Sequence, residues 1–124
     1  MLDHVSLQVA DLDACSALYE AVLPTLGGGK IMAYADQVGF GAGGQPMFWL
    51  GRASGSAPAR EVHIAFRAEN RAAVRAWFDA AVAAGAEVLH EPRVRPEYHP
   101  EYYGAFVRDP DGNNVEAVCH RPEQ

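Results

Sequence analysis

Residues 3–9 read DHVSLQV, and residues 61–66 read EVHIAF. In both stretches apolar and polar residues alternate, which is typical of a strand with one buried face. Each stretch also carries a histidine near its start, His4 in the first and His63 in the second, on the face opposite the apolar residues. Two such strands, about half a chain apart, indicate an internal repeat.

Aligning His4 with His63 extends the similarity without a gap into the segments that follow. Asp11 then aligns with Asn70, and both are residue types that cap the N-termini of helices. After each cap, apolar residues recur at three- and four-residue spacing, which predicts one amphipathic helix in each copy. These positions are Leu12, Cys15, Leu18, Tyr19 and Val22 in the first copy and Val74, Trp77, Phe78, Ala81 and Val82 in the second.

The ends of both helices carry helix-breaking residues. Pro24 and the glycines at 27–29 end the first helix, and Gly85 ends the second. Short strand-like stretches follow each helix, which gives both copies the order βαβββ. They are 30–34, 37–41 and 46–50 in the first copy and 87–90, 102–108 and 114–119 in the second.

The whole chain, 1–124, is therefore predicted to be one α+β domain made of two modules. The modules span about 1–52 and 61–120, and residues 53–60 have the composition of a linker. A module of about sixty residues buries too little surface to be stable on its own. We therefore expect the two βαβββ modules to share a curved mixed sheet with the helices on its convex side.

Composition narrows the possible functions of the 124 residues. The formal net charge is −6 and the basic residues form no stripe, so we expect no nucleic-acid partner. No stretch approaches the roughly 20 apolar residues of a membrane span, and no signal peptide is apparent. The two cysteines, Cys15 and Cys119, are far apart in sequence, which favours a reduced, cytoplasmic protein.

The repeated histidines suggest a metal site. If a pseudo-twofold axis relates the modules, His4 and His63 face one cleft, and alternation along the last strand adds Glu116 to the same side. Two histidines and one carboxylate form an open site suited to Fe, Mn, Ni or Zn. A single histidine near the start of a strand is more often an ordinary surface residue. The hypothesis therefore depends on the combination of the three.

Three segments together resemble the vicinal oxygen chelate superfamily, which includes glyoxalase I, extradiol dioxygenases, and fosfomycin and bleomycin resistance proteins. They are DHVSLQVADL (3–12), VHIAF (62–66) and FVRDPDGNNVEAV (106–118). The resemblance implies paired βαβββ modules around a metal cleft, a chemistry in which the metal chelates two neighbouring oxygens, and a homodimer.

By position in these motifs, the resemblance assigns the metal ligands to His4, His63 and Glu116. Glyoxalase I uses a fourth ligand, a glutamate late in the first module, but this chain has none between Glu20 and Glu61. A set of three ligands is similar to that of extradiol dioxygenases and fosfomycin resistance proteins. The fosfomycin type also needs cationic groups to bind a phosphonate, and the sequence reveals none. Many relatives also have histidine where this chain has Asn113.

Residues near these ligands are candidates for binding substrate. Phe48 and Trp49 are expected to form an aromatic wall, and Ser6 shares the face of His4. Arg67 shares the face of His63 and is a candidate partner for an anionic group. Ser6 is alternatively an ordinary solvated serine, and Arg67 is alternatively an exposed arginine at a strand end with no role in binding.

The segment 93–106, RVRPEYHPEYYGAF, is typical of a lid or substrate wall. We assign Tyr103 and His99 as candidate catalytic residues, with Tyr98 and Tyr102 as alternatives. The predicted function is a metal-dependent glyoxalase- or dioxygenase-like enzyme, of lyase, isomerase or extradiol type, acting on a small molecule with adjacent oxygens. The alternative is a non-catalytic protein that sequesters a ligand or antibiotic, as bleomycin resistance proteins do.

Overall fold

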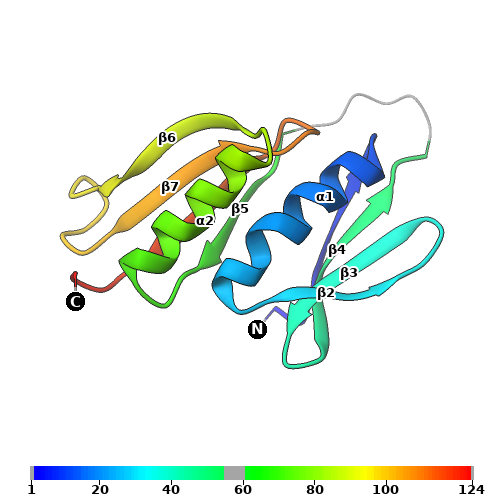
Figure 1. Ribbon diagram of the computed structural model, residues 1–124, viewed down its shortest axis with the longest axis horizontal. Coiled ribbons are helices and arrows are strands. Elements are labelled where there is room, and N and C mark those ends of the chain that lie inside the picture. The colour runs from blue at the N-terminus through cyan, green and yellow to red at the C-terminus, as the bar shows by residue number, and fades with distance from the viewer. Residues whose placement is uncertain (1, 55–60, 124) are drawn as a thin grey trace.

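The computed structural model describes residues 2–54 and 61–123. Both modules have the order predicted from the sequence repeat (Figure 1). The first contains β1 (Val5–Val9), α1 (Leu12–Val22), the short 3-10 helix η1 (Leu23–Leu26), β2 (Gly29–Ala33), β3 (Gln37–Ala42) and β4 (Gln45–Arg52). The second contains β5 (His63–Arg67), α2 (Arg71–Ala83), β6 (Glu87–Val94), β7 (Tyr103–Arg108) and β8 (Asn114–Cys119). Most of the predicted linker at 53–60 lies outside the described residues.

Each module contributes one four-stranded mixed sheet. The strand orders are β1-β4-β3-β2 and β5-β8-β7-β6, with β1 parallel to β4 and β5 parallel to β8. The α+β class with two βαβββ modules is confirmed. Within the described ranges the strands pair in two separate sheets, so the curved surface is built from two sheets. Figure 1 shows both helices in front of the sheets, and α1 contacts α2.

The two predicted helix caps are formed. Oδ1 of Asp11 accepts a hydrogen bond from the backbone N–H of Ala14 at 3.0 Å, and Oδ1 of Asn70 accepts one from that of Ala73 at 2.8 Å. The predicted apolar face of α1 is fully buried, and in α2 the buried residues are Val74, Trp77 and Ala81. Val82 was expected in this stripe but lies in the last turn of α2 and is 46% exposed.

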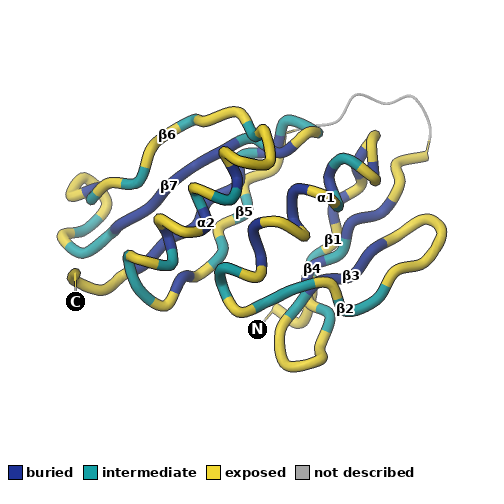
Figure 2. The backbone as a smooth tube through the Cα atoms, viewed as in Figure 1, coloured by how far each residue is buried: buried dark blue, intermediate teal, exposed yellow. Residues whose placement is uncertain are grey.

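In the second sheet the inner strand β7 is buried and the edge strand β6 is mostly exposed. Figure 2 shows β7 as buried, whereas β6 is largely exposed. This follows from the strand order, since β6 is an edge strand and β7 lies between β6 and β8. The predicted strand at 87–90 was too short: β6 continues to Val94 through Pro92, which an edge strand tolerates because its outer N–H groups need no partner.

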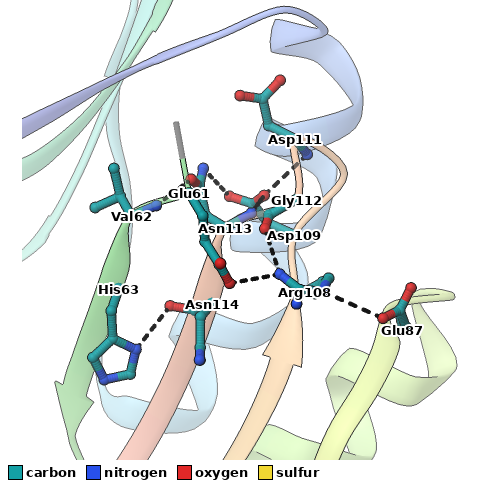
Figure 3. Close-up of polar contacts among 10 residues, drawn as sticks. All are labelled: Glu61, Val62, His63, Glu87, Arg108, Asp109, Asp111, Gly112, Asn113 and Asn114. Atoms are coloured by element: carbon teal, nitrogen blue, oxygen red, sulfur yellow. Dashed lines mark hydrogen bonds and ion pairs between the residues drawn. The ribbon is translucent and has the colours of Figure 1, made fainter. Parts of the chain in front are cut away.

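The turn before β8 joins the two modules. The buried Asp109 accepts a hydrogen bond from the hydroxyl of Tyr19 on α1 at 2.8 Å, and Asp111 accepts one from the backbone N–H of Ala10 at 3.0 Å. Asn113 donates to Asp109 and accepts from the backbone N–H of Val62 at 3.0 Å (Figure 3). Asn113 therefore stabilises the turn and the start of β5.

Among the described residues, no helix combines the length and the apolar character that a membrane crossing requires.

Candidate functional site

The parallel pairing of β5 with β8 positions the polar residues of the second module. Ala65 lies opposite Glu116 and His63 opposite Asn114. Because side chains alternate along a strand, His63 and Glu116 share the face that points away from the helices. Phe106 lies opposite Glu116 across β7 and β8, so it belongs to this face as well.

His63 and Glu116 are in direct contact. Nε2 of His63 lies 3.0 Å from Oε1 of Glu116, and Nδ1 lies 3.2 Å from the backbone oxygen of Asn114 (Figure 3 shows the latter contact). The carbonyl oxygen of Asn114 and the carboxylate of Glu116 both only accept, so a neutral His63 donates to one of them, from whichever ring nitrogen carries the proton. With the proton on Nδ1, Nε2 presents a lone pair to a carboxylate that is 1% exposed. Two facing acceptors are stabilised only by a second proton on His63 or by a cation bound to both.

Tyr102 holds the other oxygen of the same carboxylate. Its hydroxyl donates a hydrogen bond to Oε2 of Glu116. Burial, followed by this bond to Glu116, raises the pKa of Tyr102. The phenol therefore remains a donor at neutral pH.

A glycine makes room for this contact. A Cβ atom at Gly104 would lie 2.9 Å from Oε2 of Glu116 and 3.3 Å from Cε1 of Tyr102, closer than real Cβ atoms normally approach such neighbours. The absent side chain of Gly104 thus allows the carboxylate and the phenol to meet.

An aromatic ring lies beside His63. Its imidazole stacks on the ring of Phe106 with centroids 6.0 Å apart and an interplanar angle of 19°. His90, from the edge strand β6, meets the same phenyl ring edge-on at 5.4 Å. Neither Phe106 nor His90 was predicted as a site residue, although the alternation of 102–108 indicates the face of Phe106.

His4 lies across a cavity from His63. The cavity has a volume of about 440 Å³, and its lining includes both histidines, Met47 and Phe48. Nδ1 of His4 pairs with Oδ1 of Asp3 at 2.7 Å. Within residues 2–54 and 61–123, no three His, Cys, Asp or Glu side chains are grouped to hold one metal ion. A single chain thus joins two of the three predicted ligands.

The two rings of the expected aromatic wall point in opposite directions. Phe48 is buried on the helix side, where its ring lies 4.8 Å from that of Tyr19 and 5.3 Å from that of Phe66. Trp49 lies on the other face and packs over Gly39. Consecutive residues of a strand alternate between faces, so the two rings do not form one wall.

Ser6 and Arg67 are both exposed. Ser6 lies opposite Trp49 in the pairing of β1 with β4, so it shares the face of that ring. Arg67 borders an apolar cavity of about 240 Å³ whose lining includes Phe48 and Phe66.

The two candidate catalytic residues have hydrogen-bond partners other than Glu116. Tyr103 is buried against α2, where its hydroxyl accepts a hydrogen bond from Nη1 of Arg75 at 3.4 Å. His99 pairs with His120, with Nε2 and Nδ1 2.7 Å apart. Of the four residues proposed from segment 93–106, Tyr102 contacts the carboxylate directly.

The comparisons with known proteins agree with this architecture. The family model described as the Glyoxalase/Bleomycin resistance protein/Dioxygenase superfamily matches residues 1–117. A solved glyoxalase/bleomycin resistance protein from Albidiferax ferrireducens T118 is similar at 28% identity, with a TM-score of 0.81, covering 94% of this chain and 96% of that chain.

Two further solved structures are similar. Lactoylglutathione lyase from Agrobacterium tumefaciens shares 27% identity, with a TM-score of 0.70 over 96% of this chain and 92% of that one. A fosfomycin resistance protein from Listeria monocytogenes, in complex with Mn(II) and 1S,2S-dihydroxypropylphosphonic acid, shares 20% identity, with a TM-score of 0.68 over 94% and 87%. The comparison with curated proteins found no match.

Proposed function

The chain belongs to the Glyoxalase/Bleomycin resistance protein/Dioxygenase superfamily, and from this premise we propose that it is a metal-dependent enzyme acting on a small molecule with two neighbouring oxygen atoms. The metal ligands in this proposal are His63, Glu116 and His4. The observation that carries it is the contact between Nε2 of His63 and Oε1 of Glu116.

The donor set fits a divalent cation. Two ligand atoms bound about 2.1 Å from one ion at a right angle lie about 3 Å apart, and Nε2 and Oε1 are separated by 3.0 Å. When Nδ1 carries the proton, its hydrogen bond to the carbonyl of Asn114 leaves the Nε2 lone pair as a ligand, an arrangement common in histidine metal sites. The same donor set suits Fe, Mn, Ni or Zn. The Listeria relative, which has the same fold, binds Mn(II).

For the third ligand we propose His4 of a second copy of the chain. In one chain His4 pairs with Asp3, while β1 and β5 are edge strands of their sheets. A homodimer covers such edges and brings a second His4 to the site.

The chemistry follows from the residues around the carboxylate. A divalent ion held by these residues would supply a Lewis acid that stabilises negative charge on the substrate. Tyr102 fixes Oε2 of Glu116, and Phe106 fixes the plane of the His63 imidazole. The two side chains are thereby held in one orientation before substrate arrives.

Metal analysis tests the ligand assignment. Protein purified without chelator and loaded anaerobically with Mn(II), Fe(II), Ni(II) or Zn(II) is expected to bind one ion per site. His4→Ala, His63→Ala and Glu116→Gln should each lower the metal content. Glu20→Gln, which removes a carboxylate on α1 that pairs with Lys30, should not. If each ligand variant keeps the stoichiometry of the parent, the assignment is wrong.

Mixing two variants tests whether the site is shared. Mixed dimers of the His4→Ala and Glu116→Gln chains contain one intact site, composed of His63 and Glu116 from the first chain and His4 from the second. We therefore expect metal binding to return to as much as half that of the parent. No recovery in verified mixed dimers would place all three ligands in one chain.

Ligand sequestration is the second candidate function. The apolar cavity lined by Phe40, Phe48 and Phe66 supports this function, because such a cavity binds apolar groups without catalysing a reaction. A panel of a catechol, an α-hydroxythioester and an epoxide, tested with each metal, distinguishes the two. Turnover supports the enzyme. Absence of turnover with every metal, together with tight binding of an apolar ligand, supports sequestration.

A further inference from the structure

Arg95 is a buried cation with few partners. It follows β6 directly and is 5% exposed. Its Nε and Nη2 atoms are buried and have no hydrogen-bond partner among the described residues. Nη1 is the remaining nitrogen, and it lies 3.7 Å from Oε2 of Glu97. Buried donors are rarely left unpaired, so the free nitrogens indicate a missing acceptor.

The two free nitrogens define the kind of acceptor. Nε and Nη2 lie on one edge of the planar guanidinium and point their N–H groups in parallel. This edge matches the two oxygens of a carboxylate, which it binds through two parallel hydrogen bonds. The nitrogen outside this edge, Nη1, is the one that faces Glu97.

Arg95 is connected to the His63–Glu116 pair through Phe106 and Tyr102. Val94 lies opposite Tyr103, which packs against α2, so Arg95 and Tyr102 point to the other face. The backbone N–H of Arg95 donates to the carbonyl oxygen of Tyr102 at 2.7 Å. Its guanidinium carbon lies 4.8 Å from the ring centroid of Phe106, the ring that stacks on His63.

We propose that the Nε and Nη2 edge of Arg95 binds a carboxylate group of the small-molecule ligand. This inference rests on the proposed function and specifies its substrate class: a small acid whose other oxygens face His63 and Glu116. Tyr98, which is 59% exposed, lies 5.8 Å from the same guanidinium. We expect its ring to move when the acid enters.

If Arg95 had only a structural role, its replacement would have a different effect. The guanidinium also contacts the rings of Phe106 and Tyr98, and such contacts stabilise a fold without any ligand. Loss of that role alone would lower the unfolding temperature. It would not change how the protein discriminates an acid from its amide.

The test compares glycolate with its uncharged analogue glycolamide, by calorimetry on the full chain with and without Mn(II). The parent should bind glycolate at least about tenfold more tightly than glycolamide, as expected for a pair of charge-assisted hydrogen bonds. Arg95→Gln should abolish this preference. Arg95→Lys keeps the charge but lacks the two parallel N–H groups, so it should retain part of the preference for glycolate.

Arg93→Gln is the matched control, since Arg93 is exposed and binds Glu97 and the carbonyl of Val94. It should keep the preference of the parent. An unchanged preference in Arg95→Gln, or methylphosphonate binding more tightly than glycolate, would overturn the proposal. A preference that depends on Arg95 without Mn(II) supports the anion site even if the metal-site proposal fails.

Discussion

Tyr102 and Tyr103 are consecutive residues whose hydroxyl groups lie on opposite faces of the second sheet. The hydroxyl of Tyr102 donates to Glu116 on the cleft face, whereas that of Tyr103 accepts from Arg75 of α2 on the helix face. Any role of these tyrosines in the cleft therefore belongs to Tyr102.

Replacing Tyr102 with phenylalanine should weaken metal binding. The substitution removes the hydrogen bond that orients Glu116, and the loss of such a supporting contact typically lowers metal affinity 10- to 100-fold. We expect about a tenfold loss of Mn(II) affinity in Tyr102→Phe, measured by calorimetry. Tyr103→Phe, the matched control, should remain within about twofold. Equal affinities in the two variants would show that Tyr102 does not support the carboxylate.

Gly104→Ala should disturb the same carboxylate by steric means. The added Cβ would lie 2.9 Å from Oε2 of Glu116, so the carboxylate has to shift. We expect weaker Mn(II) binding and a loss of stability of about 1–3 kcal/mol, measured by urea unfolding. Gly29→Ala is the control, because a Cβ in that strand would meet nothing within 4 Å. A Gly104→Ala protein that binds Mn(II) like the parent would contradict the packing of this site.

Local sequence signals were sufficient to predict the repeated fold. Asp11 and Asn70 cap their helices by hydrogen bonds within three residues, and apolar spacing alone identifies the buried face of α1. The contact between His63 and Glu116 also followed from strand alternation, because both residues lie on paired, regular strands.

Sequence alone did not identify Arg95, and it named Tyr102 only as one of four candidates in segment 93–106, because the strand register there was not known. The strand was predicted to end at His90, whereas β6 continues along the sheet edge to Val94 with shifts in its pairing near His90. The face of each later residue depends on those shifts. The burial of Arg95 and the orientation of Tyr103 toward α2 therefore depend on tertiary packing, which the local pattern does not contain.

Tyr19→Phe should weaken the connection between the modules. The hydroxyl of Tyr19 donates to buried Asp109 at 2.8 Å, and its removal leaves that carboxylate with fewer donors. We expect a loss of about 1–3 kcal/mol in the free energy of unfolding, measured with urea. Tyr34→Phe is the control, since Tyr34 is 60% exposed and its hydroxyl donates to Sδ of Met32 at 3.4 Å. This substitution should change stability by less than about 0.5 kcal/mol. Equal stability of the two variants would show that the bond to Asp109 contributes nothing.

The stability of the protein should fall in alkaline solution partly because of Cys15. Burial, reinforced by the negative charges of Asp109 and Asp111, raises the pKa of the Cys15 thiol from 9.0 to about 12. The folded state therefore keeps a proton that the unfolded state releases. This contribution is fully present below about pH 9 and is lost as the pH rises toward 12.

Cys15→Ala should make the decline of stability between pH 9 and 12 shallower, by at most about 1.4 kcal/mol per pH unit, because one pKa unit corresponds to that energy. The measurement is the free energy of unfolding in urea at several pH values across this window. Val22→Ala removes a buried, non-titrating side chain from the same helix face, so it should lower the whole curve without changing its slope. Burial of Tyr19 raises its pKa too, so the Cys15 variant should retain some alkaline loss. An identical slope in parent and Cys15→Ala would mean that the thiol titrates alike in the folded and unfolded states.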